Sequence, residues 1–223
     1  MKSSRWIIFV CLFPSVAIAA LTNEERRSQF EKALAVIVAT ATPNTTTHQR
    51  QTMIKEYLDA KPNKAQAVQL ENGVYWRSPE HEDASVAGDR ALEGCQLHWG
   101  GVPCVLLAVN DEIVADGKLV AKDMPRLHYA GEYDPSQIPT IRPATRQRPD
   151  VQNYGKAMEP KAMAIHPWGR LFISAGDASP TAAQESALAK CNSDPTRSRR
   201  DGDCYVYAVN QNVVIGERRM SPK

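Results

Sequence analysis

The 223-residue sequence lacks an excess of charge of either sign, because 27 lysines and arginines stand against 25 aspartates and glutamates. A chain whose main ligand is nucleic acid normally carries a clear basic surplus, so we expect no nucleic-acid partner. The balance is uneven along the chain: residues 20–141 hold 12 basic and 17 acidic side chains, and residues 142–223 hold 13 basic and 8 acidic ones. The sequence therefore predicts that the two halves attract each other.

A second long apolar run is also missing. The only such run lies within residues 1–19, where Lys2 and Arg5 precede apolar residues from Trp6 to Phe13 and small residues follow. This order is typical of a secretory signal peptide, and the run is short for a membrane span. We predict a signal peptide, with an uncleaved membrane anchor as the alternative. The mature chain is then expected to be periplasmic or secreted, without a transmembrane segment.

Fingerprints of common active sites are missing as well. The chain contains no G-x-S-x-G, H-E-x-x-H, phosphate-binding loop or dinucleotide-binding pattern. These patterns supply the nucleophile, the metal ligands or the phosphate cradle of large enzyme classes, so their absence argues against those classes. The sequence predicts no catalytic residue, no cofactor and no metal site.

Cysteine is scarce, and its number becomes even once Cys11 is set aside with the predicted signal peptide. The remaining cysteines are Cys95, Cys104, Cys191 and Cys204. Four cysteines in an exported chain predict two disulfides. A zinc site is the alternative, although neither pair has the C-x2-C spacing of a zinc ribbon.

What the sequence does contain is an internal repeat. "CVLLAVNDEIV" starts at Cys104, and "CYVYAVNQNVV" starts at Cys204. Upstream, "KAQAVQLENGVYWRS" from Lys64 matches "KAMAIHPWGRLFIS" from Lys161, and an alanine-rich stretch with a cysteine follows in both places. Agreement over about fifty residues indicates an internal duplication.

Each copy predicts the element order strand, strand, helix, strand, strand. Gly73 or Gly169 marks a tight turn between the first two strands, because glycine adopts positive φ at no steric cost. Asn110 or Asn210 turns the chain between the last two strands. The predicted fold is α+β: a duplicated strand-strand-helix-strand-strand unit with an antiparallel sheet and one disulfide per unit, preceded by a helical hairpin. Counting alone also permits disulfides across the copies, but the repeated spacing favours pairing within each.

The segments outside the copies complete the predicted organisation. We expect a signal peptide at 1–19, a helical hairpin at 20–62, a first α+β repeat at 64–116, a Pro-rich connecting segment at 117–160, a second repeat at 161–217 and a tail at 218–223. The hairpin, which begins with a capping box at Thr22 and Glu25, is expected to cover a sheet; a partner-binding role is the alternative. The prolines of the connecting segment oppose a regular helix or a central strand, so we predict an extended segment that wraps the surface.

Candidate ligand-binding residues are histidines and aromatic residues in predicted turns and loops. They are His98 and Trp99 between the first two cysteines, His128, Tyr129 and Tyr133 in the connecting segment, and His166 and Trp168 in the first turn of the second copy. A cleft between the copies could be lined by Tyr129, Tyr133, His128 and nearby arginines. The alternative is that the disulfide merely closes the first loop and that the other side chains pack locally. The basic stretch "RSRRDGD" from Arg197 is a further candidate for binding an anion.

The second copy, "KAMAIHPWGRLFISAGDASPTAAQESALAKC" followed by "DCYVYAVNQNVV", resembles a repeat of exported, largely alphaproteobacterial proteins whose function is uncharacterised. In that repeat an A-[IV]-x-P-x-G strand-turn precedes an alanine-rich helix and a cysteine pair. The resemblance covers residues 64–114 and 161–215. It implies the fold of the unit, and it supplies no catalytic residues.

These observations favour a non-enzymatic module of the periplasm or cell envelope that interacts with an envelope protein or an anionic ligand. Duplication without a recognisable acid, base, nucleophile or metal set is the basis of this prediction. The alternative is a small periplasmic ligand-binding protein or hydrolase with a site between the two repeats.

Overall fold

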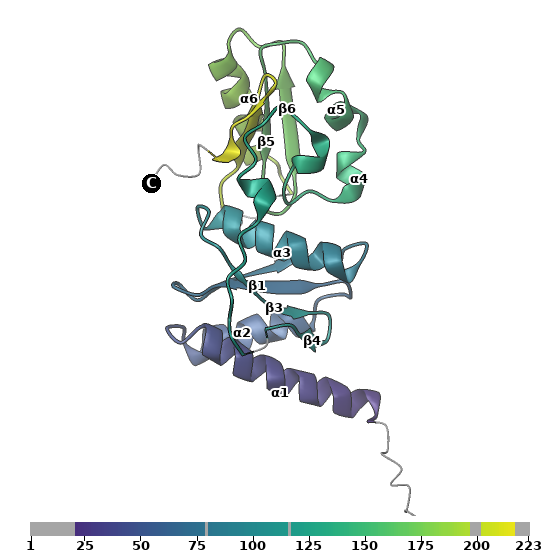
Figure 1. The fold of residues 1–223 in the computed structure, drawn as a ribbon, viewed down its shortest axis with the longest axis vertical. Helices are drawn as coiled ribbons and strands as arrows, with labels where there is room; N and C mark the ends of the chain where they lie inside the picture. Colours follow the sequence, from purple (N-terminus) through teal and green to yellow (C-terminus); the bar gives the residue numbers. More distant parts are fainter. Residues whose placement is uncertain (1–20, 79, 116, 197–201, 217–223) are drawn as a thin grey trace, which may run out of the picture.

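The structure is a computed structural model that describes residues 21–78, 80–115, 117–196 and 202–216. Two four-stranded antiparallel sheets, with strand orders β2-β1-β3-β4 and β6-β5-β7-β8, follow one another along the long axis (Figure 1). The predicted duplicated α+β fold is confirmed. The predicted signal peptide and tail, and most of the "RSRRDGD" stretch, lie outside the described residues. Within the described ranges, no helix has the length and apolar character that a membrane span requires.

Both repeats have the predicted order of elements. The first repeat consists of β1 (Ala65–Gln69), β2 (Val74–Ser78), α3 (Ala84–His98), β3 (Val105–Val109) and β4 (Glu112–Ile113). The second repeat consists of β5 (Lys161–Ile165), β6 (Leu171–Ala175), α6 (Pro180–Asn192), β7 (Tyr205–Val209) and β8 (Asn212–Val213). The central strand carries an irregularity in its pairing at the same place in both copies, after Gln66 and after Met163. The duplication therefore extends to the details of strand register.

The asparagines explain why the phrase "AVN" occurs twice. Asn110 and Asn210 have φ values of 50° and 49°, the left-handed conformation that the hairpin turn requires. The side-chain oxygen of Asn110 also accepts a hydrogen bond from the backbone of Lys64 (3.2 Å), and that of Asn210 accepts one from the backbone of Lys161 (3.1 Å). Each asparagine thus closes its hairpin and joins it to the start of the central strand.

Small residues let each long helix lie close to its sheet. Ala87 and Ala91 of α3, like Ala183 and Ala187 of α6, are fully buried. The helix of the first repeat passes Cys95 and continues to His98. The cysteine lies on the buried side of the last helical turn, where its sulfur can reach the start of β3.

The two disulfides join Cys95 to Cys104 and Cys191 to Cys204. Pairing within each copy is confirmed, with sequence separations of 9 and 13 residues. Closing loops of this size removes chain entropy from the unfolded state worth about 3 kcal/mol each. Two buried disulfides indicate an oxidising environment outside the cytoplasm.

The predicted helical hairpin is confirmed as α1 (Asn23–Ala41) and α2 (Thr47–Leu58). Thr22 and Glu25 form the capping box that begins α1. The hairpin covers the face of the first sheet opposite α3. Its core residues Phe30, Leu34, Val38, Met53 and Tyr57 pack with Val68, Val105 and Leu107 of the sheet.

The connecting segment contains more helix than its prolines predicted. Its short helical turns are η1 (Pro125–Leu127), η2 (Pro135–Gln137), α4 (Pro143–Arg146), α5 (Pro149–Gln152) and η3 (Tyr154–Lys156). Four of the five begin with proline, because a fixed φ and a missing N–H suit the first helical position. Its fully buried residues Leu127, Ile138, Ile141, Val151 and Tyr154 pack with Met163, Ile165 and Tyr207. The segment therefore covers the second sheet as the helical hairpin covers the first.

Candidate ligand site between the repeats

A cleft of about 490 Å³ opens where the first repeat, the connecting segment and the second repeat meet. Its lining residues include Trp76, Ser78, His81, Arg90, Arg142 and Trp168. They come from β2, the β2–α3 loop, α3, the start of α4 and the β5–β6 turn. Segments far apart in the sequence thus build this site together.

Two tryptophans form one side of the cleft. The ring centroids of Trp76 and Trp168 are 4.6 Å apart, with the planes tilted by 37°. Trp76 lies against α3 at Gly94, where any Cβ atom would overlap the indole ring. His98 stacks behind Trp76 at 5.0 Å, and Trp99 meets His98 edge-on at 4.7 Å. The result is an aromatic surface that joins both repeats.

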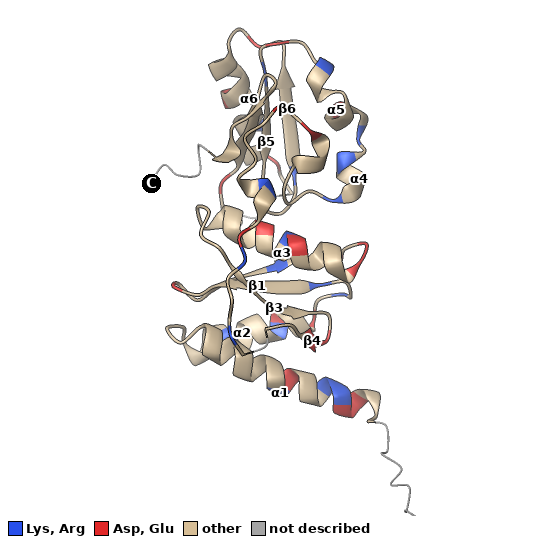
Figure 2. Cartoon of the chain, viewed as in Figure 1, with Lys and Arg blue, Asp and Glu red and all other residues tan. Residues whose placement is uncertain are grey.

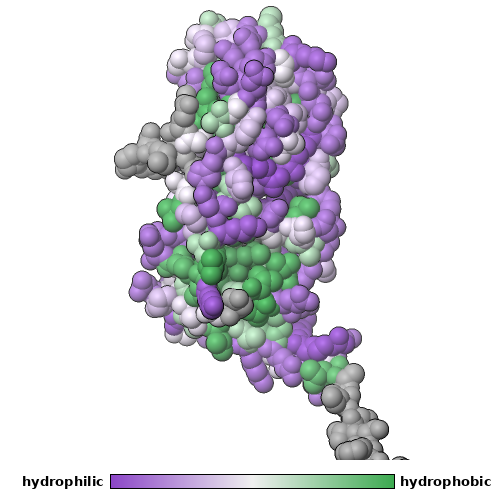
Figure 3. Space-filling view, viewed as in Figure 1, coloured by the Kyte–Doolittle hydropathy of each residue, from purple (hydrophilic) through white to green (hydrophobic). Residues whose placement is uncertain are grey.

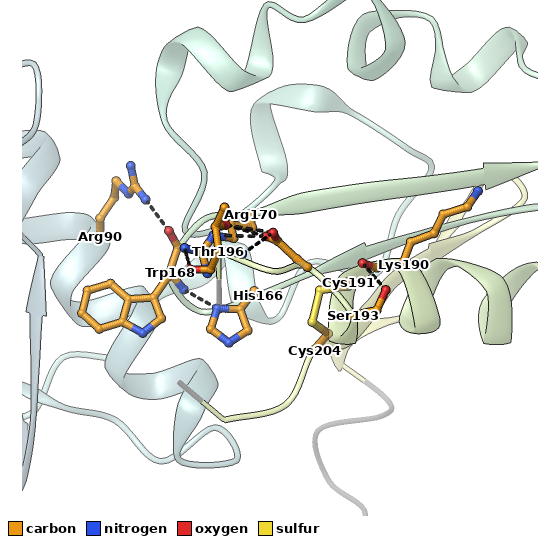
Figure 4. Close-up of polar contacts among 10 residues, drawn as sticks. Arg90, His166, Trp168, Arg170, Lys190, Cys191, Ser193, Thr196 and Cys204 are labelled. Carbon is orange, nitrogen blue, oxygen red and sulfur yellow. Dashed lines mark hydrogen bonds and ion pairs between the residues drawn. A yellow bond between two sulfur atoms is a disulfide. The ribbon is translucent and has the colours of Figure 1, made fainter. Parts of the chain in front are cut away.

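Arg90 of α3 crosses from the first repeat to the second. It is only 6% exposed, and its guanidinium donates to His81 Nδ1 (3.3 Å) and to the Trp168 carbonyl (3.4 Å; Figure 4). Gly169 allows this approach, because a Cβ atom there would overlap the guanidinium and the Thr140 carbonyl. Burial, followed by the nearby charge of Arg142, lowers the pKa of Arg90 to about 10, so the side chain remains charged at neutral pH.

The positive charge at this site is only partly offset, because Glu93 and Glu82 favour the charged form of Arg90 less strongly than burial and Arg142 oppose it. In the described ranges, no carboxylate forms an ion pair with Arg90 or Arg142, and the guanidinium of Arg142 makes no hydrogen bond. Arginines recur along α4 and next to its ends (Figure 2), where the sequence has Arg142, Arg146 and Arg148. A buried cation without a counter-ion is costly, and an anion placed between the two arginines would offset that cost.

Arg170 contributes less charge to the cleft, because it has its own partners. Its Nε lies 3.4 Å from a carboxylate oxygen of Asp194, and its guanidinium donates to the Thr196 carbonyl (2.7 Å; Figure 4). The unbalanced charge is therefore concentrated on the side formed by α3 and α4.

Ser78 and His81 form a buried pair with an interatomic distance of 2.6 Å between Oγ and Nε2. A guanidinium can only donate, so Nδ1 of His81 accepts from Arg90 and the ring proton resides on Nε2. His81 then donates to Ser78 and cannot accept the serine proton. Burial, followed by Arg90 and Arg142, also lowers the pKa of His81 to about 4. The pair resembles a nucleophile and base in composition but has the wrong proton arrangement for that role.

A buried carboxylate fixes the connecting segment to α3 behind the cleft. Glu93 is fully buried, accepts from Arg126 Nε (2.5 Å), and accepts from the backbone N–H of Thr140 (2.7 Å). Burial raises the pKa of Glu93, and the Arg126 charge opposes that rise. Thr140 lies two residues before Arg142, so this contact positions one of the two arginines.

The structure brings some of the sequence-predicted site residues together at the junction. His98, Trp99 and Trp168 belong to the aromatic cluster, although His98 is the last residue of α3 and does not lie in a loop. His166 is fully buried, and its Nδ1 accepts from the backbone N–H of Trp168 (3.2 Å), so it shapes the turn that presents Trp168.

The other predicted residues hold the connecting segment in place. The ring of His128 pairs with Asp123 (2.6 Å), Tyr129 donates to the Glu132 carbonyl (2.8 Å), and Tyr133 donates to the Val151 carbonyl (2.7 Å). None of the three lines the cleft.

Sequence reasoning missed Trp76, Ser78, His81, Arg90 and Arg142. A usable signal was the divergence between the copies. Aligned on "ALEGC" and "ALAKC", Arg90 corresponds to Ser186 and Gly94 to Lys190. Strand pairing likewise places Trp76 where the second repeat has Phe172. Some of the positions that build the junction, Arg90 and Gly94 among them, thus differ in chemistry between the copies.

Comparisons with models of known protein families, with curated proteins and with solved structures find no match to this chain. Across the described ranges, no three His, Cys, Asp or Glu side chains lie close enough together to hold a metal ion.

Proposed function

We propose that this protein is exported by its predicted signal peptide to the periplasm or the medium and binds a small anionic ligand in the cleft between its repeats. The observation that carries the proposal is the buried guanidinium of Arg90, which has Arg142 nearby and no carboxylate partner in the described chain. A carboxylate or phosphate between the two arginines supplies the missing charge.

The aromatic wall indicates the rest of the ligand. Trp76 and Trp168 offer a flat apolar surface beside the arginines. Flat and cyclic groups, such as a sugar ring, pack well on indole faces. The cleft volume of about 490 Å³ suits a small molecule. An acidic sugar combines both features, with its ring on the tryptophans and its anionic group on the arginines.

The proposed role is binding without turnover. The proton arrangement of Ser78 and His81 opposes nucleophilic catalysis, and a pKa of about 4 makes His81 a weak base at neutral pH. His81 instead accepts from the guanidinium of Arg90, and Ser78 holds the other ring nitrogen of His81. This reading favours a ligand-binding protein over a hydrolase.

The test uses the mature full-length chain with two probes, D-glucuronate and inorganic phosphate. Binding is followed by calorimetry and by the fluorescence of the cleft tryptophans. Arg142→Gln removes an exposed charge whose guanidinium makes no hydrogen bond or ion pair within the described chain, so we expect intact folding and an affinity for glucuronate about ten-fold lower. Arg26→Gln on α1 is the matched control, since it makes the same change of net charge away from the cleft, and its affinity should stay within about two-fold.

Two results would contradict the proposal. One is the absence of binding by either probe at low salt. The other is an equal loss in Arg142→Gln and Arg26→Gln, which would indicate attraction by overall charge and no defined site.

A module that docks onto an envelope protein is the second candidate function. It is favoured by a different observation, the apolar surface and open sheet edge of the first repeat, and it concerns a different face of the molecule.

A further inference from the structure

The outer edge of the second sheet is paired by the chain itself. Residues 131–133 of the connecting segment run antiparallel to β8. The N–H of Val213 donates to the Gly131 carbonyl (3.0 Å), and the N–H of Tyr133 donates to the Gln211 carbonyl (2.7 Å). Glu132 lies opposite Asn212. A short bridging segment thus pairs with the edge of this four-stranded sheet.

The equivalent edge of the first sheet has the same geometry. The N–H of Val114 donates inward to the Leu107 carbonyl (3.0 Å), as the N–H of Val214 donates to the Tyr207 carbonyl (2.8 Å). Successive N–H groups of a strand point to opposite sides, so the N–H of Ile113 points outward. It corresponds to the N–H that Gly131 satisfies in the second repeat.

No fifth strand pairs with this edge in the described part of the chain. The sheet order ends at β4, and neither an isolated bridge nor a turn hydrogen bond reaches Ile113 or the Asp111 carbonyl from another segment. The chain after β4 instead returns to pair with Cys104 through the N–H of Lys122 (2.8 Å). Among the described residues, the edge of β4 therefore lacks the backbone partner that residues 131–133 provide for β8.

An apolar groove of about 590 Å³ runs beside the open edge, between α3 and strands β3 and β4. Its lining residues include Leu92, Leu106, Val109, Val114 and Val120. Val114 is 43% exposed and Val120 is 72% exposed. Figure 3 shows the resulting apolar patch on the first repeat, while the same face of the second repeat is mostly hydrophilic. Exposed apolar surface of this extent is typical of protein interaction sites.

We propose that β4 and this groove bind an extended segment of a partner protein, which adds to the first sheet as residues 131–133 add to the second. Backbone pairing supplies affinity, and side chains on alternate positions supply specificity. The proposal concerns a surface separate from the cleft and does not depend on the anionic ligand.

The side chains along β4 also indicate the sequence of the partner segment. In antiparallel pairing, one residue lies opposite Val114 and a residue two positions later lies opposite Glu112. Val114 and Glu112 both line the groove. The partner should therefore present an apolar side chain followed two positions later by lysine or arginine.

A second copy of the chain fits this edge less well. Residues 131–133 of each copy are already paired within their own chain. The remaining candidate would be β4 of the second copy. This strand has only two residues, and the carboxylates of Asp111 and Glu112 lie next to each other at its start. Two such acidic segments would repel each other.

The test selects random twelve-residue peptides displayed on phage against the immobilised mature chain, and then measures the affinity of the synthesised winners. Ile113→Pro removes the outward N–H, a change that an edge strand tolerates. Ile113→Val, which keeps the N–H, is the matched control. Gly88→Gln is a second variant, which fills part of the groove with a side chain. Glutamine is the residue at the corresponding position of the second repeat, Gln184. A Cβ atom at Gly88 makes ordinary contacts with Leu106 and Val109.

We expect winners with an apolar residue two positions before lysine or arginine. They should slow amide hydrogen exchange at Ile113, lose affinity about ten-fold or more in Ile113→Pro and Gly88→Gln, and stay within about two-fold in Ile113→Val. The proposal is overturned if no peptide is enriched, or if the winners bind both variants as tightly as the original chain. It is also overturned if the edge serves self-association that Ile113→Pro abolishes, or if the groove binds anionic lipid vesicles and no peptide.

Discussion

In the first repeat the long helix lies between two layers of the molecule, whereas in the second repeat it lies on the outside (Figure 1). Positions 90, 93 and 96 of α3 are buried and carry Arg, Glu and Gln. The corresponding positions of α6, residues 186, 189 and 192, are at most half-buried and carry Ser, Ala and Asn. The same backbone thus supports a polar junction in one copy and a solvent-facing helix in the other. The two copies share one fold. The candidate site depends on side chains of the outward face of α3 that the outward face of α6 does not have.

The parts that did not diverge are those that hold each unit together. The Nζ atom of Lys64 donates to the carbonyls of Tyr57 (2.9 Å) and Ala60 (3.0 Å) in the preceding segment. The Nζ atom of Lys161 donates in the same way to Gly155 (3.0 Å) and Ala157 (3.1 Å).

Each lysine also lies over a tyrosine. The distances from Nζ to the ring centroid are 4.8 Å for Lys64 over Tyr57 and 5.2 Å for Lys161 over Tyr154. Both tyrosines precede their lysine by the same spacing, so the repeated unit extends upstream to residue 57 and residue 154.

The largest expected loss of stability comes from removing either disulfide. Replacing either pair by alanine should lower the free energy of unfolding by about 3 kcal/mol from loop entropy alone. Both sulfurs of the Cys95–Cys104 pair belong to the core that the two repeats share, whereas the Cys191–Cys204 pair packs only with its own helix and sheet. We therefore expect the first double variant to lose at least as much as the second, although its loop is shorter.

Denaturant unfolding of both double variants measures these losses. A clearly larger loss for Cys191→Ala/Cys204→Ala would show that loop length outweighs packing at the junction.

A smaller loss of stability is expected when Gly94 is replaced by alanine, and a still smaller one when Lys190 is. Gly94→Ala places a Cβ atom inside the indole ring of Trp76 and should cost about 2 kcal/mol, because the ring must leave its position between α3 and Trp168. Lys190→Ala at the corresponding position removes exposed hydrogen bonds to the Ile173 carbonyl and the Ser174 hydroxyl, and it should cost less than about 0.5 kcal/mol.

Thermal unfolding of the two variants measures this contrast, and Trp76 fluorescence reports the ring movement. Equal losses would mean that the tryptophan contact does not distinguish the two helices energetically.

The fold could be predicted from the sequence because its determinants are local and occur twice. Gly73, Asn110 and the paired cysteines each specify a turn or a closure within a short stretch of chain, and the second copy provides an independent check. The connecting segment was harder. Its prolines predict the absence of a regular helix, yet four of them begin short helical turns. Its buried residues pack on a sheet that follows later in the sequence.

The candidate site could not be predicted in the same way. Trp76, Arg90, Arg142 and Trp168 become neighbours only when the second repeat packs on α3, and no local pattern encodes that packing. The sequence predicts histidines and aromatic residues in loops as ligand-binding residues, but three of them hold the connecting segment in place. The decisive residues are arginines and a serine–histidine pair that look ordinary in the sequence.

The pH dependence of stability should belong to the first repeat, because its residue His81 corresponds to Asp177 in the second. The native pKa of His81 is about 4, below the ordinary value of 6.5, so the unfolded chain binds a proton at this site before the folded chain does. Stability from this group is then complete above pH 6.5 and is lost as the pH falls toward 4. The loss between pH 7 and pH 5 should be roughly 1–2 kcal/mol.

Urea unfolding at both pH values, with the original chain and His81→Gln, isolates this effect. The glutamine keeps a donor and an acceptor but does not titrate, so the difference between the two chains removes the contribution of other ionising groups. We expect the stability advantage of the original chain to shrink by that amount at pH 5. An advantage that is the same at both pH values would mean that folding does not lower the pKa of His81, and that the ring binds a proton in the folded protein near pH 6.5 in spite of its contact with Arg90.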